Sequence, residues 1–160
     1  GIKEIESAIA EHHFSIIWSK TPRQKNLAYK DDEEILRQKS SENKLDSLES
    51  KIRLTVAEFA SDFVFLHAGA VAYQDKAIII PAKSFSGKTT LVAELAGRGL
   101  GYYSDEYAVI DKDGMLHPFT KQLSMRGIIN SYEQVDMDVE EFGGSKAEKP
   151  INIGLILVST

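Results

Sequence analysis

The stretch from Lys76 to Thr90 constrains the fold of this chain more than any other part of its sequence. It opens with the short apolar run Ala77–Ile80, which is typical of a buried strand. A tight segment follows and ends in Gly87, and Lys88-Thr89-Thr90 then opens an apolar pattern with helical spacing. A strand, a short loop ending in Gly-Lys-Thr and a helix are the context of a phosphate-binding loop of the Walker A type.

Positions in this loop predict particular chemical roles. The backbone N–H groups of the loop and the positive end of the helix form a cradle for phosphate anions. We expect the Lys88 ammonium to reach the outer phosphates, the Thr89 hydroxyl to help hold Mg²⁺, and Gly87 to let the backbone approach closely. The alternative is a Ser- and Gly-rich turn that precedes a helix by chance.

One position departs from the motif, because Ala82 occupies the slot of the first glycine. Alanine is small enough to let the backbone approach a phosphate, but it tolerates a positive φ poorly, at a cost of roughly 1 kcal/mol. We therefore expect Ala82 either to adopt an ordinary φ or to carry mild strain.

Length and composition indicate a folded protein. The chain has 160 residues, of which 42% are hydrophobic, enough for one domain with a sizeable core and too many for global disorder. A net charge of −5 argues against nucleic acid or an anionic membrane as a general partner. The absence of cysteine excludes a disulfide framework and a thiolate metal site, and it fits a cytoplasmic location. No apolar run approaches the ~18 residues of a membrane span.

The pattern divides the chain into residues 1–44, an N-terminal region with a charged connection, and residues 45–160, a domain that contains the loop. Within the charged segment we expect a short helix near Glu33–Gln38. An apolar stripe predicts a helix over Leu45–Phe59, with Asp46 as its N-cap. The final apolar run has no polar tail, so we expect the natural chain to continue beyond Thr160.

Around the loop, apolar runs and turn signals predict a series of strands. These strands are Phe14–Ser19, Phe63–His67, Ala70–Tyr73, Lys76–Ile80, Leu100–Ser104, Tyr107–Asp111, Met115–His117 and Ile151–Val158. Gln74-Asp75 and Lys112-Asp113-Gly114 are candidate hairpin turns. The acidic segment from Glu133 to Gly144 is interpreted as a loop.

Beyond the loop, phosphoryl transfer needs a metal ligand and a group that orients or deprotonates the nucleophile. Asp105 and Glu106 follow the strand that returns after the helix of the loop, so they are candidates for both tasks. The alternative is a solvated acidic turn between two strands. His67 and Arg126 are further candidates, with a structural histidine and a surface arginine as their alternatives.

Three segments together resemble the catalytic domain of HPr kinase/phosphorylase and its relatives. They are Leu66-His67-Ala68-Gly69-Ala70-Val71, then Pro81 to Thr90, and then Tyr103-Ser104-Asp105-Glu106-Tyr107-Ala108-Val109. The resemblance covers Phe63 to Arg126. Its departures from the family pattern are Ala82 in place of the first loop glycine, Glu106 in place of an aspartate, and Ala68 within the His-Gly pair.

The resemblance implies an α/β fold in which a mixed β-sheet carries the P-loop, with flanking helices, as in phosphoenolpyruvate carboxykinase. It implies that Asp105 is the catalytic carboxylate, with His67 and Lys88 as further active-site residues. Thr89 and Glu106 would be the metal-side ligands of Mg²⁺. The residues implied to bind ATP are Ala82, Lys83, Ser84, Phe85, Ser86, Gly87, Lys88, Thr89, Thr90 and Arg126.

We therefore expect an ATP- and Mg²⁺-dependent kinase that transfers phosphate to a hydroxyl of a protein serine or of a small molecule. Two alternatives stay open at this point: a nucleotide-binding regulatory module without turnover, and a simple NTPase whose acceptor is water. The partners we expect are a nucleotide and an acceptor of unknown identity, but neither nucleic acid nor a membrane. The sequence leaves open whether the chain forms homo-oligomers.

Overall fold

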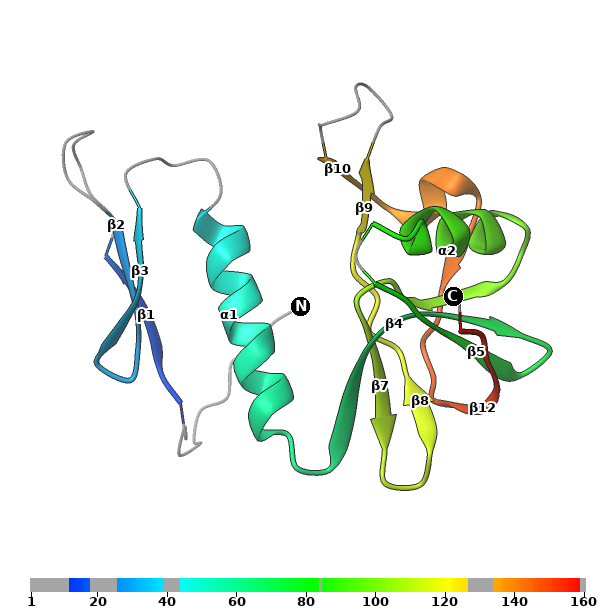
Figure 1. Ribbon diagram of the computed structural model, residues 1–160, viewed down its shortest axis with the longest axis horizontal. Coiled ribbons are helices and arrows are strands. Elements are labelled where there is room, and N and C mark those ends of the chain that lie inside the picture. The colour runs from blue at the N-terminus through cyan, green and yellow to red at the C-terminus, as the bar shows by residue number, and fades with distance from the viewer. Residues whose placement is uncertain (1–11, 18–25, 39–43, 84, 127–133, 159–160) are drawn as a thin grey trace. The chain divides into compact units, whose positions relative to one another are not determined.

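The computed structural model describes residues 12–17, 26–38, 44–83, 85–126 and 134–158 (Figure 1). The chain divides into two compact units, residues 1–59 and 60–160. This division follows the first helix, whereas the sequence pattern predicted a boundary before that helix, between residues 44 and 45. The described part of the chain is mixed α/β, with a large mixed sheet and two α-helices, which confirms the α/β class and the mixed sheet that the resemblance implied.

The first unit contains an antiparallel sheet and a helix. Strands β1 (Phe14–Ile17), β2 (Asn26–Lys30) and β3 (Glu33–Gln38) pair in the order β1-β2-β3. Helix α1 (Lys44–Phe59) follows them in the chain.

The prediction of a short helix near Glu33–Gln38 is wrong, because these residues form β3. Asp31 and Asp32 join β2 to β3 with φ angles of 53° and 76°. A positive φ at both central residues is the property of a type I′ hairpin turn, and Asp tolerates this conformation better than most side chains. The Asp31 carboxylate also accepts the backbone N–H of His13 at 2.7 Å, which holds the turn beside the start of β1.

Helix α1 confirms the helix predicted over Leu45–Phe59, with two differences. It begins at Lys44, so Asp46 lies inside its first turn and is not its N-cap. Only part of the predicted stripe is buried: the Leu48 side chain is 8% exposed, whereas Phe59 is 50% exposed.

The second unit is built on a seven-stranded mixed sheet. Its strands are β4 (Phe63–Tyr73), β5 (Lys76–Pro81), β6 (Gly101–Ser104), β7 (Tyr107–Asp111), β8 (Met115–His117), β11 (Ser145–Lys146) and β12 (Ile151–Ile156). The order is β11-β6-β4-β5-β12-β8-β7, in which β12 is parallel to β5 and β11 is parallel to β6. Because β7 also pairs with β4, the strands β4, β5, β12, β8 and β7 close into a ring.

The two strands predicted around Ala68-Gly69 are one continuous strand, β4. Its first half, from Phe63 to His67, pairs with β7, and its second half pairs with β5 and β6. Ala68 and Gly69 themselves pair with the end of β5, so the ladder is not interrupted there. Every part of β4 thus finds a hydrogen-bonding partner, which a break at the glycine would forfeit.

Helix α2 (Lys88–Gly97) packs on the sheet and completes one side of the hydrophobic core. Val92 from α2, Val71 from β4 and Tyr102 from β6 are fully buried in this core. The helix approaches β4 very closely at Gly69, where an added Cβ would lie 2.6 Å from Val92 Cγ2. Real Cβ atoms do not approach other atoms this closely, so glycine at this position lets α2 rest directly on the sheet.

The acidic segment is more regular than the predicted loop. Strand β10 (Gln134–Met137) pairs with β9 (Leu123–Arg126) in an antiparallel ribbon, and the 3₁₀ turn η1 (Val139–Phe142) follows. Val139 is fully buried against α2, which anchors this segment to the core. The loop prediction failed because it weighed the acidic residues and not the apolar ones between them.

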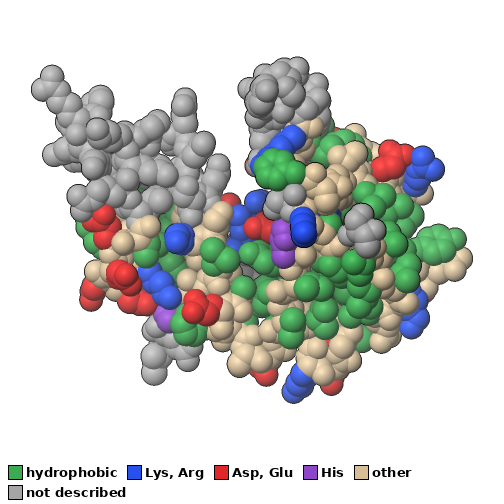
Figure 2. All heavy atoms as spheres, in the orientation of Figure 1, with side chains coloured by type: hydrophobic (Ala, Val, Ile, Leu, Met, Phe, Trp, Pro, Cys, Tyr) green, Lys and Arg blue, Asp and Glu red, His purple; other side chains and the backbone are tan. Residues whose placement is uncertain are grey.

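Hydrophobic side chains also remain on the surface of the second unit. Figure 2 shows them over much of the visible face of this unit. The exposed ones include Tyr73 and the C-terminal run Leu155 to Val158. Within the described residues, no helix is both long enough and apolar enough to cross a membrane.

Replacement of Gly69 by alanine should destabilise the second unit by about 1–3 kcal/mol, the usual range for overpacking a tight interior. The clash would fall on Val92, a stiff β-branched side chain without room to move. Gly101→Ala is the matched control, because its Cβ would make only an ordinary 3.6 Å contact with Ala72. Urea unfolding of the two variants checks this expectation, and equal stabilities would contradict it.

The β7–β8 hairpin carries a hydrogen-bonded carboxylate, Asp111, whose contribution to stability depends on pH. The Asp111 carboxylate lies 2.7 Å from His117 Nε2 and accepts the backbone N–H of Met115. These hydrogen bonds, chiefly the one with His117, lower the pKa of Asp111 below its ordinary value of 3.8. A lowered pKa in the folded state means that the carboxylate stabilises the fold above this pH and loses that effect in stronger acid.

Asp111→Asn should therefore lower the unfolding temperature at pH 7, and the difference from the unmodified protein should shrink as the pH falls below about 4. Thermal unfolding of both proteins between pH 7 and pH 3 checks this. A difference that stays constant across this range would show that the charge of Asp111 has no part in the effect.

Candidate functional site

The predicted strand, loop and helix are present, as β5, residues 82–87 and α2. Gly87 is the residue that precedes the helix, with a left-handed φ of 84°. A side chain at Gly87 would meet no other atom within 4 Å, so its backbone conformation, and not space, requires glycine. Gly87 has no side chain to cap the helix, so the first backbone N–H groups of α2 lack the usual side-chain partner.

Strain in the loop falls on Phe85 and not on Ala82. Ala82 does not have a positive φ, so the first of the two conformations expected for it is confirmed. Phe85 has a φ of 68°, which costs a non-glycine residue about 1–2 kcal/mol. Its ring is 86% exposed, so burial does not offset this cost.

Lys88 and Thr89, the first two residues of α2, both contact Asp105. Lys88 Nζ lies 2.8 Å from Asp105 Oδ1 and also donates to the backbone carbonyl of the same residue. Thr89 donates its hydroxyl to the other carboxylate oxygen, Asp105 Oδ2, at 2.7 Å. The side chains of Lys88 and Asp105 are only 9% and 11% exposed, so this ion pair is shielded from water.

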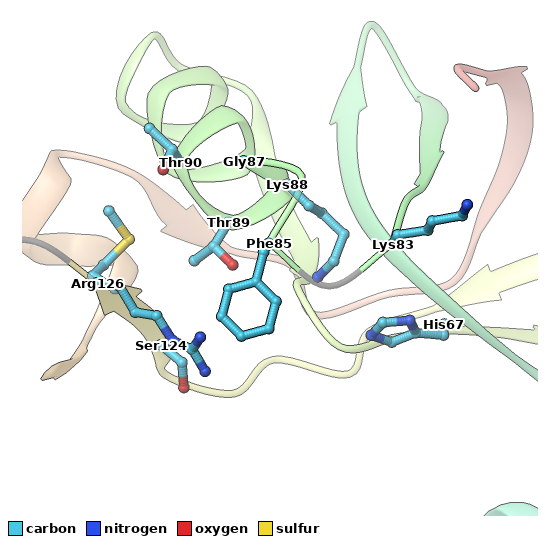
Figure 3. Close-up of a pocket in the computed structure, with 10 residues that line it drawn as sticks. His67, Lys83, Phe85, Gly87, Lys88, Thr89, Thr90, Ser124 and Arg126 are labelled. Atoms are coloured by element: carbon cyan, nitrogen blue, oxygen red, sulfur yellow. The ribbon is translucent and has the colours of Figure 1, made fainter. Parts of the chain in front are cut away.

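The aliphatic part of Lys88 passes over Gly69 on its way to this contact. A Cβ added at Gly69 would lie 3.3 Å from Lys88 Cγ. The glycine predicted as part of the His-Gly segment thus allows both the helix and the lysine to lie close to β4. Figure 3 shows Lys88 and Thr89 extending from the start of α2 into the pocket.

A rigid turn places the two carboxylates after β6. Ser104 Oγ accepts the backbone N–H groups of Glu106 and Tyr107 at 3.1 and 3.0 Å, and Ser104 is only 1% exposed. The Glu106 carbonyl in turn accepts the N–H of Ala68 in β4 at 3.3 Å. The orientation of the Asp105-Glu106 pair is therefore set by buried backbone contacts.

Two neighbouring pockets share residues of the site. The first has a volume of about 380 Å³ and is lined by His67, Lys83, Phe85, Gly87, Lys88, Thr89, Thr90, Ser124, Met125 and Arg126. The second, of about 290 Å³, is lined by His67, Tyr102, Asp105, Glu106, Lys121, Gln122, Ser124 and Arg126. His67, Ser124 and Arg126 line both, so the loop and the acidic pair lie on the two sides of these residues.

The second pocket has a fixed wall. The Tyr102 hydroxyl donates to the backbone carbonyl of Lys121 at 2.8 Å, which ties the segment before β9 to the core. Burial of Tyr102, reinforced by the charge of Asp105, raises the pKa of this hydroxyl, so it remains protonated and available as a donor. The Lys121 ammonium is thereby held near Glu106, with Nζ 3.5 Å from Oε2.

The structure brings together most of the residues that the sequence singled out. His67, Lys83, Phe85, Gly87, Lys88, Thr89, Thr90 and Arg126 line the first pocket, and Asp105 and Glu106 line the second. Ala82 and Ser86 belong to the loop but line neither pocket, and Ser84 lies outside the described residues. Among the described residues, no group of three or more His, Cys, Asp or Glu could hold a metal by itself.

Sequence reasoning missed two features of the site. Lys121 was not singled out, because its position depends on a hydrogen bond from Tyr102 in β6. The residues next to Lys121 in the sequence give no sign of this contact. Phe85 was taken only as a member of the loop, although its guanidinium partner is near: Arg126 Cζ lies 4.4 Å from the ring centroid. A bulky aromatic residue inside a Ser- and Gly-rich turn was the available signal for Phe85.

Comparison of the chain with protein-family models, with curated proteins and with solved structures finds no match.

The shielded ion pair should make a large contribution that depends on both partners. We expect Lys88→Met and Asp105→Asn each to destabilise the protein by roughly 3 kcal/mol, because each leaves a shielded polar group without its charged partner. The double variant should lose clearly less than the sum of the two, as coupled neighbours do. Urea unfolding of the four proteins measures this coupling.

The pair Glu94 and Arg98 on α2 is the matched control, with side chains 61% and 72% exposed and a 2.7 Å contact. Its coupling, measured in the same way with Glu94→Gln and Arg98→Met, should not exceed about 0.5 kcal/mol. Equal coupling in the two pairs would mean that Lys88 and Asp105 are as solvated as a surface pair.

Proposed function

We propose that the second unit is a kinase of the HPr kinase/phosphorylase type, which binds ATP with Mg²⁺ and transfers phosphate to a hydroxyl of a protein serine or a small molecule. One observation carries this proposal: Lys88 and Thr89, at the start of α2, both donate to the Asp105 carboxylate. A cation, a hydroxyl and a carboxylate thus meet at a helix N-terminus that follows a glycine. Phosphoryl transfer relies on this combination for charge stabilisation and metal binding.

The contacts of Asp105 indicate how an anion would be held. Its carboxylate accepts hydrogen bonds from the Lys88 ammonium and the Thr89 hydroxyl. These are the donors that a bound phosphate group would need. Phosphate oxygens present the same negatively charged acceptors, so a bound triphosphate would compete with Asp105 for Lys88. Backbone N–H groups at the start of α2 would supply further donors.

The oxygen atoms at this point fit Mg²⁺. Thr89 Oγ1 and Asp105 Oδ2 are 2.7 Å apart, somewhat less than the roughly 3.0 Å between neighbouring ligands of an octahedral ion with bonds near 2.1 Å. Mg²⁺ is commonly held by one or two protein oxygens together with substrate phosphates, so a site with few protein ligands is sufficient. Bound there, the ion would neutralise charge on the phosphates.

The placement of the two acids favours a division of roles that differs from the one implied by the resemblance. Asp105 contacts Thr89 directly, so we assign it to the metal side. Glu106 lines the neighbouring pocket with His67 and Lys121, which is where the proposed acceptor hydroxyl would bind. We therefore assign to Glu106 the task of orienting or accepting the proton of the acceptor.

Mg²⁺-ATP at ~100 times its dissociation constant should stabilise the protein by about 2.7 kcal/mol, and Lys88→Met should abolish this effect. Thermal unfolding with and without Mg²⁺-ATP measures this shift, and the unfolding temperature of each variant with the ligand is compared with that of the same variant without it. Lys112→Met, in the turn between β7 and β8, should retain the full shift. The absence of any shift in the unmodified protein would contradict the proposal.

The same proteins separate the kinase from its two alternatives. A nucleotide-binding module without turnover would show the thermal shift but no consumption of ATP. A simple NTPase would release phosphate at full rate without an added acceptor. For the kinase, release of phosphate from ATP should be slow in buffer without an acceptor. Glu106→Gln should transfer phosphate more slowly than the unmodified protein while showing the same thermal shift.

A further inference from the structure

Phe85 is the residue of the loop whose exposed aromatic ring the phosphate site does not explain. A phosphate cradle needs backbone N–H groups and a cation, and it needs no aromatic ring. Yet Phe85 adopts a left-handed φ of 68° with its ring 86% exposed. Strained conformations that persist without a packing reason are concentrated at sites of ligand binding.

The ring is held in place by a side chain from another element. Arg126, in β9, places its guanidinium carbon 4.4 Å from the centroid of the Phe85 ring. This cation–π contact joins the loop to β9 and limits the directions in which the ring can face. In Figure 3 Phe85 and Arg126 lie side by side in the pocket.

The size of the pocket indicates which part of a ligand meets the ring. Its volume of about 380 Å³ lies near the lower end of the range of about 300–1,000 Å³ for small-molecule sites. Phosphates bound by Lys88 and Thr89 would take up much of this space. The remainder of a nucleotide, its sugar and base, would then extend toward the mouth of the pocket, where Phe85 is exposed.

We propose that the base of a nucleotide stacks on the Phe85 ring, so that this site prefers a nucleotide to an inorganic polyphosphate as phosphate donor. This inference rests on the proposed function, because it assumes that phosphates bind at Lys88. An exposed aromatic ring offers a flat apolar face to any base, which provides affinity for the base without selecting among bases. Phe85 is then a specificity-determining residue for the class of donor.

The test compares two ligands that share their phosphates and differ in the base. Mg²⁺-ATP and Mg²⁺-tripolyphosphate are titrated by calorimetry into the unmodified chain and into Phe85→Leu, Phe85→Gly and Phe85→Trp. We expect Phe85→Leu and Phe85→Gly to bind ATP roughly 5- to 150-fold more weakly, the range that one stacked base supplies. Tripolyphosphate affinity should change less than about threefold, and Phe85→Trp should retain ATP affinity.

The three variants control for one another. Phe85→Leu keeps an apolar side chain and the backbone strain but removes the aromatic face, whereas Phe85→Gly removes the strain as well. If both ligands weaken equally, or if Phe85→Leu binds ATP as the unmodified protein does, the stacking inference is overturned while the phosphate site stands. If the unmodified chain binds neither ligand, the proposed function fails with it.

Discussion

The shielded ion pair between Lys88 and Asp105 is the interaction on which the candidate site depends. It joins the start of α2 to the turn after β6, two segments that are not adjacent in the sequence. The approach is possible because Gly69 has no side chain beneath the stem of Lys88. A charged pair removed from water stabilises the fold only while both partners are present. The catalytic candidates are therefore also structural residues, and variants at these positions alter stability together with any activity.

The two sides of this pair are held by different kinds of contact. The acidic side rests on buried groups: Ser104 holds the turn, and Tyr102 holds the backbone at Lys121. On the loop side, Phe85 has an exposed ring and a strained backbone, and its ring makes a cation–π contact with Arg126. In the function we propose, the exposed ring would receive the nucleotide, while the buried contacts of Ser104 and Tyr102 would keep the backbone of the Asp105-Glu106 turn in place.

Local patterns allowed part of this structure to be predicted from sequence. The elements from β5 to β8 follow from apolar runs separated by turns, most of which contain glycine, signals that lie within a few residues of each element. The hairpin at Asp31-Asp32 was missed because its turn lies in a highly charged segment, and the charged residues among 33–38 outweighed their strand character. In the site, it was predictable from motifs that Lys88, Thr89 and Asp105 would be candidate residues of one site. Their direct contact was not, because it depends on how α2 settles on the sheet at Gly69.

The position of β5 between β4 and β12 has a consequence for how the protein assembles. The β4–β5 hairpin is joined by a two-residue turn and can form as soon as both strands exist. The other edge of β5 must wait for Ile151–Ile156, whose parallel pairing closes a long stretch of chain. During synthesis, the strand that leads into the loop therefore leaves the ribosome with one open edge. Until β12 has been synthesised and pairs with β5, that edge can pair with strands of other chains. The late pairing of β12 therefore protects β5 from aggregation.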